Sequence, residues 1–105
     1  MNLLDPWWSV EKEDANYHKT FIQELRIEIP SGHKIFELPV KMLARGSGDD
    51  TLFEIDDGSK RVAVVHLTWA KQVEHLPYPL TTIYENLDEF FQSCMLPQHE
   101  LWKHE

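Results

Sequence analysis

The residue best suited to chemistry is His66, which lies in the most strand-like run of the chain, Arg61–Trp69 (RVAVVHLTW). An imidazole titrates near neutral pH, so it can act as an acid, a base or a ligand-binding group. Side chains alternate along a strand, so His66 and Thr68 are expected to lie side by side on one sheet face. This polar pair is the first candidate for a binding surface. The alternative is a structural histidine bonded to a neighbouring strand or loop, which is favoured because the segment contains no second titratable partner.

A second candidate surface is the segment Val73–Pro79 (VEHLPYP). Its prolines exclude helix and central strand, so the segment is predicted to be an ordered loop. His75 and Tyr78 are candidate binding residues, because long irregular loops in small domains often carry function. The alternative, equally open, is a rigid loop that only covers the edge of the sheet.

Two adjacent tryptophans, Trp7 and Trp8, lie near the start of the chain. They cannot both face the same way on regular structure, so one is expected to pack on the core and the other to meet solvent or a partner. Both are candidate binding residues. Tyr78 and Trp102 are further candidates for exposed aromatic side chains.

No pattern of residues predicts a catalytic or metal site. The histidines lack the His-Glu-x-x-His spacing, and one cysteine, Cys94, can build neither a cysteine-rich zinc site nor an intramolecular disulfide. Cys94 lies on the apolar stripe of a predicted helix, which indicates packing rather than nucleophilic catalysis. An acidic cluster on one predicted hairpin lacks the ordering of a calcium loop and indicates a solvated edge. The cluster consists of Asp49, Asp50, Glu54, Asp56 and Asp57. The sequence therefore predicts no catalytic residue, no metal and no cofactor.

Two helices are predicted to position these candidates. Apolar side chains at helical spacing predict a first helix over residues 15–28, with Asp14 as its cap. A second helix is expected over residues 86–95 (NLDEFFQSCM), where Asn86 begins a capping box and one face is wholly apolar. Pro97 is expected to stop or restart this second helix.

Three short strands with tight turns are predicted between the helices, and a fourth strand is expected after the proline-containing loop. The Asp57–Gly58 pair is a strong hairpin signal. Tight turns imply an antiparallel meander, because parallel pairing needs a long crossover. The expected strands cover residues 40–47, 51–56, 61–69 and 80–85.

The alternation in the third predicted strand indicates how the layers are arranged. One row of side chains is wholly apolar and is expected to pack against both helices, whereas the other row is mixed and fits a partly open face. The apolar row is Ala63, Val65, Leu67 and Trp69, and the mixed row is Val62, Val64, His66 and Thr68. The prediction is a single α+β domain over residues 1–105, with residues 1–14 as an N-terminal extension. Its architecture is a two-layer sandwich in the order helix, three- to four-stranded antiparallel meander, helix.

The chain has 105 residues, of which 18 are acidic and 10 basic, and a formal net charge of −8. Such a surface repels phosphate backbones and anionic lipid heads, so nucleic-acid and membrane binding are disfavoured and a basic protein partner is favoured. Acidity also keeps a small domain soluble. The single cysteine suits a reducing compartment, and the sequence lacks a signal-peptide pattern and any apolar run near the roughly 20 residues of a membrane span. A cytoplasmic location is therefore expected.

Several motifs resemble a family of small bacterial proteins known only as hypothetical proteins. The likeness spans roughly residues 20–95 and consists of a leading helix ending near QEL, a DD-x-LF strand, a VAVVHLTW strand and a terminal acidic-aromatic helix with LDEFF. Its most specific piece is VVHLTW. The resemblance implies a folded bacterial domain, and it lends no activity, cofactor or catalytic residue to this chain.

Three functions are consistent with these patterns. The first is a non-enzymatic cytoplasmic domain that binds another protein, one version being an immunity or antitoxin-type protein whose acidic face neutralises a basic toxin. The second is a small-molecule binding domain or weak enzyme that uses the open sheet face, with His66 as the polar anchor. The third is a subunit of a homo-oligomer that buries the mixed sheet face.

Overall fold

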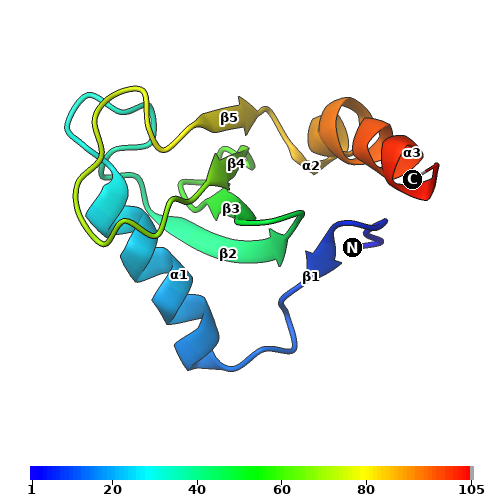
Figure 1. Cartoon of the computed structure of the whole chain (residues 1–105), viewed down its shortest axis with the longest axis horizontal. Coiled ribbons are helices and arrows are strands. Elements are labelled where there is room, and N and C mark those ends of the chain that lie inside the picture. The colour runs from blue at the N-terminus through cyan, green and yellow to red at the C-terminus, as the bar shows by residue number, and fades with distance from the viewer. Residues whose placement is uncertain (105) are drawn as a thin grey trace.

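Five antiparallel strands form one sheet in the computed structural model, which describes residues 1–104 (Figure 1). The strands lie side by side in chain order, β1-β2-β3-β4-β5. The α+β class and the antiparallel meander are thus confirmed, whereas the sheet has five strands rather than three or four and begins before the first helix. The strands are β1 (Trp8–Ser9), β2 (Val40–Arg45), β3 (Asp50–Ile55), β4 (Val62–His66) and β5 (Thr81–Tyr84).

The first helix, α1 (Ala15–Glu28), has the predicted bounds. The side chain of Asp14 caps it by accepting a hydrogen bond from the Tyr17 N–H at 2.8 Å, which satisfies one of the free donors at a helix start. The apolar stripe of α1 packs on the sheet face that carries the predicted apolar row. This core contains Phe21 and Leu25 from the helix, with Met42, Phe53, Ile55, Ala63, Val65 and Leu67 from the sheet side.

The C-terminal helical segment is longer than expected. It runs through α2 (Leu87–Phe90), the π-helical turn η1 (Phe91–Met95) and α3 (Leu96–Lys103). Of the two outcomes expected at Pro97, a restart is the one found, since α3 begins at Leu96 with Pro97 in its first turn. A proline ring ordinarily clashes with the carbonyl four residues before it, but the wider π turn comes just before Pro97, which lies in the first turn of α3 where a missing N–H costs little.

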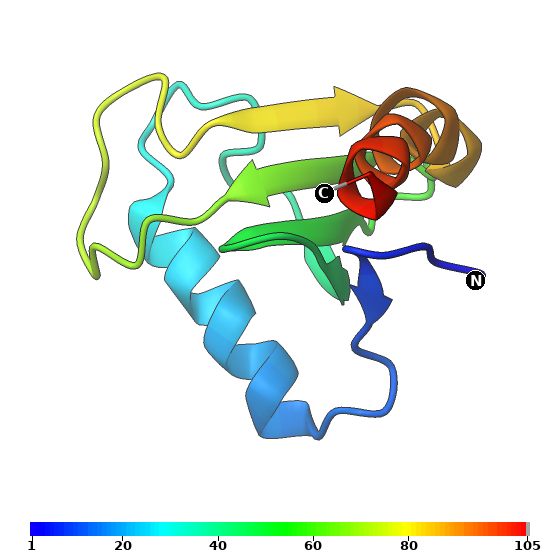
Figure 2. The ribbon, with the colours of Figure 1, turned by 45° about the vertical axis from the view of Figure 1, so that its right-hand side comes forward.

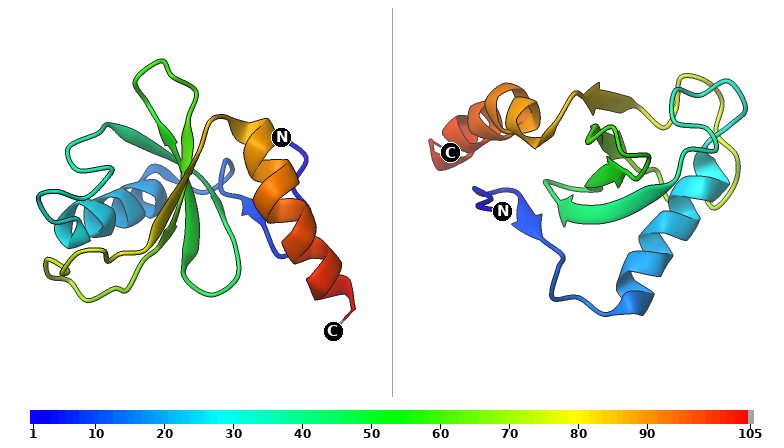
Figure 3. Two further views of the ribbon diagram at one scale, coloured as in Figure 1. Left: turned by 90° about the horizontal axis from the view of Figure 1, so that it is seen from above. Right: turned by 180° about the vertical axis from the view of Figure 1, so that it is seen from behind.

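The two helical units lie on opposite faces of the sheet (Figure 3, left), so the predicted two-layer sandwich is wrong. Phe90 and Met95 from the C-terminal segment pack with Leu52, Val62 and Val64. The C-terminal helical segment therefore covers the two valines of the mixed row, Val62 and Val64. Only the His66 end of this row is exposed, because the C-terminal helices cross the sheet at the other end of β4.

The N-terminal segment, expected as an extension, belongs to the sheet and to the core. Strand β1 pairs with β2, and Trp7 is 1% exposed. Its ring meets the edge of Phe90 at 5.0 Å between centroids, and its Nε1 donates to Gln98 of α3, so the segment passes beside the last helix (Figure 2). Gly46 makes room for this ring, because a Cβ there would lie 2.8 Å from it.

No helix within residues 1–104 combines the length and the apolarity that a membrane crossing requires.

Candidate functional site

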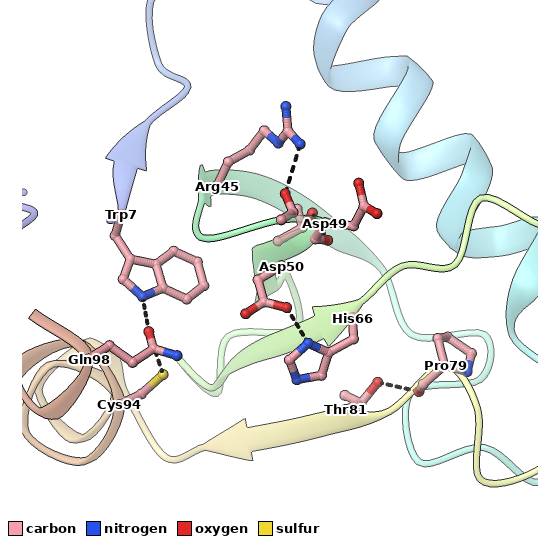
Figure 4. Close-up of polar contacts among 11 residues, drawn as sticks. Trp7, Arg45, Asp49, Asp50, His66, Pro79, Thr81, Cys94 and Gln98 are labelled. Atoms are coloured by element: carbon pink, nitrogen blue, oxygen red, sulfur yellow. Dashed lines mark hydrogen bonds and ion pairs between the residues drawn. The ribbon is translucent and has the colours of Figure 1, made fainter. Parts of the chain in front are cut away.

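His66 is paired with a carboxylate that the sequence reading missed. Residues Asp50 and His66 lie opposite each other in the β3–β4 register, so their side chains share a sheet face. His66 Nδ1 contacts Asp50 Oδ1 (Figure 4). The Asp50 side chain is only 14% exposed, whereas that of His66 is 54% exposed. His66 therefore presents its ring to solvent while Asp50 supports it from below.

The electrostatics of this pair follow from the unequal burial. Burial raises the pKa of Asp50 above its usual value, and the charge of Asp49 adds to that effect, while the charge and hydrogen bond of His66 oppose it. Because Nδ1 is taken by Asp50, Nε2 is the ring nitrogen left for a ligand or a proton. A carboxylate that orients an imidazole in this way is a common support for acid-base chemistry.

A prediction for this pair concerns the pKa of Asp50. In His66→Phe a ring still covers the carboxyl group, but the charge and the hydrogen bond that lower its pKa are lost. We expect the pKa of Asp50 to rise further, measured by the pH dependence of its carboxyl carbon resonance. His66→Gln, which keeps a donor without the charge, is expected to give a smaller rise. An unchanged or lowered pKa in the phenylalanine variant would contradict the pairing.

Cys94 lies on the same side of the sheet as this pair and is part of the packed core there. Its thiol contacts Tyr84 and lies 3.7 Å from Gln98 Oε1, which also accepts the Trp7 indole N–H (Figure 4). Burial raises the pKa of the Cys94 thiol, and burial followed by the Cys94 contact raises the pKa of Tyr84 to about 12. Both groups are protonated at neutral pH, so the thiol is a poor nucleophile there.

Thr68 does not lie beside His66, so the predicted polar pair is wrong. Strand β4 ends at His66, and the chain then turns toward α1, with Trp69 at a φ of 57°. The Thr68 N–H donates to Glu28 Oε1 at 2.9 Å. A buried carboxylate on α1 thus draws the chain out of the sheet three residues before the predicted strand end.

The β4–β5 loop, residues 67–80, is anchored to two other parts of the molecule. On α1, Glu28 accepts hydrogen bonds from the first residues of the loop, and its carbonyl oxygen accepts the Glu74 N–H at 2.9 Å. On the connector after α1, His33 Nε2 donates to the Pro79 carbonyl at 2.9 Å. The loop and the connector consequently lie side by side at one end of the sheet (Figure 1).

Despite these anchors the loop exposes large apolar side chains. His75 and Tyr78, both predicted as candidates, are exposed, and three further apolar residues were missed. We call the loop surface the four apolar side chains Val73, Leu76, Tyr78 and Leu80, which are 63, 55, 47 and 46% exposed. These four residues alternate with prolines and polar residues in a pattern that fits neither a helix nor a strand. The sequence therefore does not show whether they are exposed or cover the core.

The two tryptophans fall on either side of the core boundary. Trp7 is buried under Phe90, so its prediction as a binding residue is wrong. Trp8 is 40% exposed, and its ring lies 6.4 Å from that of Tyr17. It belongs to β1, which is the opposite edge of the sheet from β5. Trp8 therefore lies apart from the loop surface.

Hollows in the surface lie away from His66. One of about 530 Å³ follows the outer face of α1, where Ile22 lies between Lys19 and Arg26, and another of about 380 Å³ lies beside the start of α2. Within residues 1–104, no three histidine, cysteine, aspartate or glutamate side chains are grouped so that they could hold a metal ion.

The sequence matches no protein-family model, no curated protein and no solved structure. Function is therefore inferred from the geometry of this chain alone.

Proposed function

We propose that this chain is a protein-binding domain and that the loop surface of β4–β5 is its contact site. One observation carries the proposal: a loop whose backbone is hydrogen-bonded to the side chains of Glu28 on α1 and His33 on the connector nevertheless exposes four large apolar side chains. Clustered exposed apolar residues mark interaction sites more often than scattered ones do.

The anchoring matters as much as the exposure. A partner that binds a flexible loop must offset the entropy lost when the loop becomes ordered, whereas a loop that is already fixed avoids most of that cost. Tyr78 suits such a contact because its ring adds apolar area and its hydroxyl can bond to the partner. A fixed loop with an aromatic anchor therefore favours protein recognition over a role as a simple cover.

The proposal is tested by placing a photo-reactive phenylalanine derivative at position 78 and cross-linking in cells. We expect a defined cross-linked protein that is absent when the derivative replaces Gln23 on α1. Binding of the identified partner to a Leu76→Ser, Tyr78→Ala variant is expected to weaken by roughly 10-fold or more. Aromatic and apolar side chains that become buried in a complex contribute most of the binding energy of an interface. The melting temperature should stay close to that of the parent, since both side chains are exposed.

Two comparisons give the test its controls. Trp8→Ala changes an exposed aromatic side chain at the opposite sheet edge and should leave binding unchanged. Raising the salt from about 50 mM to about 500 mM should also have little effect on an apolar contact. The antitoxin version, in which the acidic face neutralises a basic toxin, requires strong salt dependence instead. Binding that survives the double variant would contradict the loop surface as the contact site.

A second candidate function is small-ligand binding at His66. The observation in its favour is the Asp50 pair, which orients the imidazole and leaves Nε2 to solvent. The two variants separate two possible protein-contact sites. If His66→Phe abolishes partner binding while the double loop variant retains it, the face around His66 contacts the partner protein and is not a small-ligand site.

A further inference from the structure

Two buried carboxyl groups hold the start of the binding loop. Glu24 and Glu28 lie one turn apart on α1 and are 4 and 0% exposed. The two oxygens of Glu28 accept the N–H groups of Thr68 at 2.9 Å and Trp69 at 2.8 Å, and Glu24 accepts that of Lys71 at 3.1 Å. The loop thus begins with three backbone donors aimed at two adjacent carboxyl groups.

The pair has no cation to balance it. The groups that contact the Glu28 carboxyl are the carboxyl of Glu24, the backbone of Thr68 and Trp69, and the Thr68 hydroxyl. Neither glutamate forms an ion pair with a lysine, arginine or histidine among residues 1–104. Two adjacent buried carboxylates repel each other, and one shared proton relieves that repulsion. Burial first and the Glu24 contact second raise the pKa of Glu28 to about 7, against the opposing effect of the loop N–H groups.

The loop needs these hydrogen bonds because two of its residues have strained backbone angles. Trp69 and Lys71 have φ angles of 57° and 58°, in the left-handed region that non-glycine residues rarely adopt. Both residues are among the three whose N–H groups reach the glutamates. If the carboxyl groups release them, both residues can return to ordinary backbone angles and the loop start leaves α1.

We propose that the Glu24–Glu28 pair is a proton-dependent clamp that regulates how the loop surface is presented. When the pair holds one proton, the loop is docked on α1 and presents the loop surface in its fixed form. When the pair loses that proton, water must reach the two charges and the loop start detaches. The regulatory role rests on the proposed function of the loop surface, but the clamp itself does not.

The direction of the pH dependence follows from the raised pKa. The pKa of Glu28 is raised from an ordinary value of 4.5 to about 7 with the loop docked, and full release of the loop into water would return it at most to that ordinary value. A group whose docked pKa is raised contributes its full stabilisation below the open-state pKa and loses it as pH rises through the docked one. The ratio of docked to open loop should therefore fall between pH 4.5 and about 7, by at most roughly 300-fold, and level off above that range.

Amide hydrogen exchange tests the clamp without any partner. Protection factors for the Thr68, Trp69 and Lys71 amides, corrected for intrinsic exchange, are compared between about pH 5 and about pH 8.5. We expect them to fall with rising pH in the parent protein. In Glu24→Gln they should fall clearly less, because the amide donates to Glu28 and accepts from Lys71, which removes the second cause of the raised pKa while the burial of Glu28 remains. Glu28→Gln should lower protection at every pH, since its NH₂ group faces a loop donor.

Glu11→Gln is the matched control, because Glu11 is an exposed glutamate before α1, and it should follow the parent protein. Protection that is constant with pH in the parent, or that falls equally in Glu24→Gln, would overturn the clamp. Cross-linking from position 78 at both pH values tests the regulation separately. Efficiency that follows the exchange data supports it, and equal efficiency at both values overturns it. Absence of any cross-link while exchange behaves as expected would reject the proposed function and leave the clamp standing.

Discussion

Replacing Trp7 by alanine is expected to lower the free energy of unfolding by about 3–5 kcal/mol, the usual cost of removing a buried aromatic side chain and leaving a cavity. The ring is 1% exposed and meets Phe90 edge-on at 5.0 Å. The backbone of Gly46, which directly follows β2, packs closely against the ring and has no side chain that could enter the cavity. The cavity can therefore be filled only if this end of β2 moves. A domain of this size is stable by about 5–15 kcal/mol, so the variant should lose between about a fifth and nearly all of its stability.

Trp8→Ala is the matched control, because it removes the same side chain from the next position. Trp8 is 40% exposed on a two-residue edge strand, so its loss should cost less than about 1 kcal/mol. Urea denaturation followed by circular dichroism measures both variants under one condition. Equal losses for the two variants would mean that the N-terminal segment does not pack between β2 and α3 as described.

The sequence predicted that one of the two tryptophans packs inward but could not say which one. Strand β1 is too short to show alternation, and its partners, Ala44 and Arg45, lie far along the chain. Only the tertiary pairing orients the segment. For the same physical reason residues 1–14 look like an extension in the sequence, although Trp7 and Val10 complete the core.

Helices and hairpins that are specified by caps, spacing and turn residues were predictable from the sequence. The placement of the two helical units on opposite faces of the sheet was not. The Asp14 cap and the helical spacing after it define α1, and the Asp57–Gly58 turn defines the β3–β4 hairpin. Which sheet face each helix covers depends on non-local packing. Both rows of β4 contain enough apolar area to bury, since Val62 and Val64 lie in the mixed row, so a one-sided arrangement was only the simpler assumption.

The candidate site was predictable in the same uneven way. Gly58 lies midway between Asp50 and His66, so the hairpin turn that the sequence indicates already places them opposite each other. The glutamates that hold the loop give no such signal. Helical spacing from Tyr17 and Phe21 places both glutamates on the apolar face of α1, but the N–H groups that they accept come from a loop some 40 residues away, as the Glu28–Thr68 contact shows.

His33 is a structural histidine bonded to neighbouring backbone, the role that the sequence favoured for His66. It is 7% exposed, its Nδ1 accepts the Ile35 N–H at 3.2 Å, and its Nε2 donates to the Pro79 carbonyl at 2.9 Å. Both ring nitrogens are therefore bonded to backbone groups, one within the connector and one in the β4–β5 loop. His66, by contrast, has an exposed ring that bonds to a side chain.

His33→Ala is accordingly expected to cost about 2–3 kcal/mol of unfolding free energy, because it leaves the buried Ile35 N–H without its acceptor, removes one of the two donors to the Pro79 carbonyl and opens a cavity. His75→Ala, in the exposed part of the same loop, should change the unfolding free energy by less than about 0.5 kcal/mol. Guanidinium denaturation compares the two. Because His33 joins the connector to the loop at Pro79, amide exchange at Tyr78 should also accelerate in His33→Ala. A stable variant with an unchanged loop would show that α1 alone fixes the loop, and that the second anchor contributes nothing to the surface we propose.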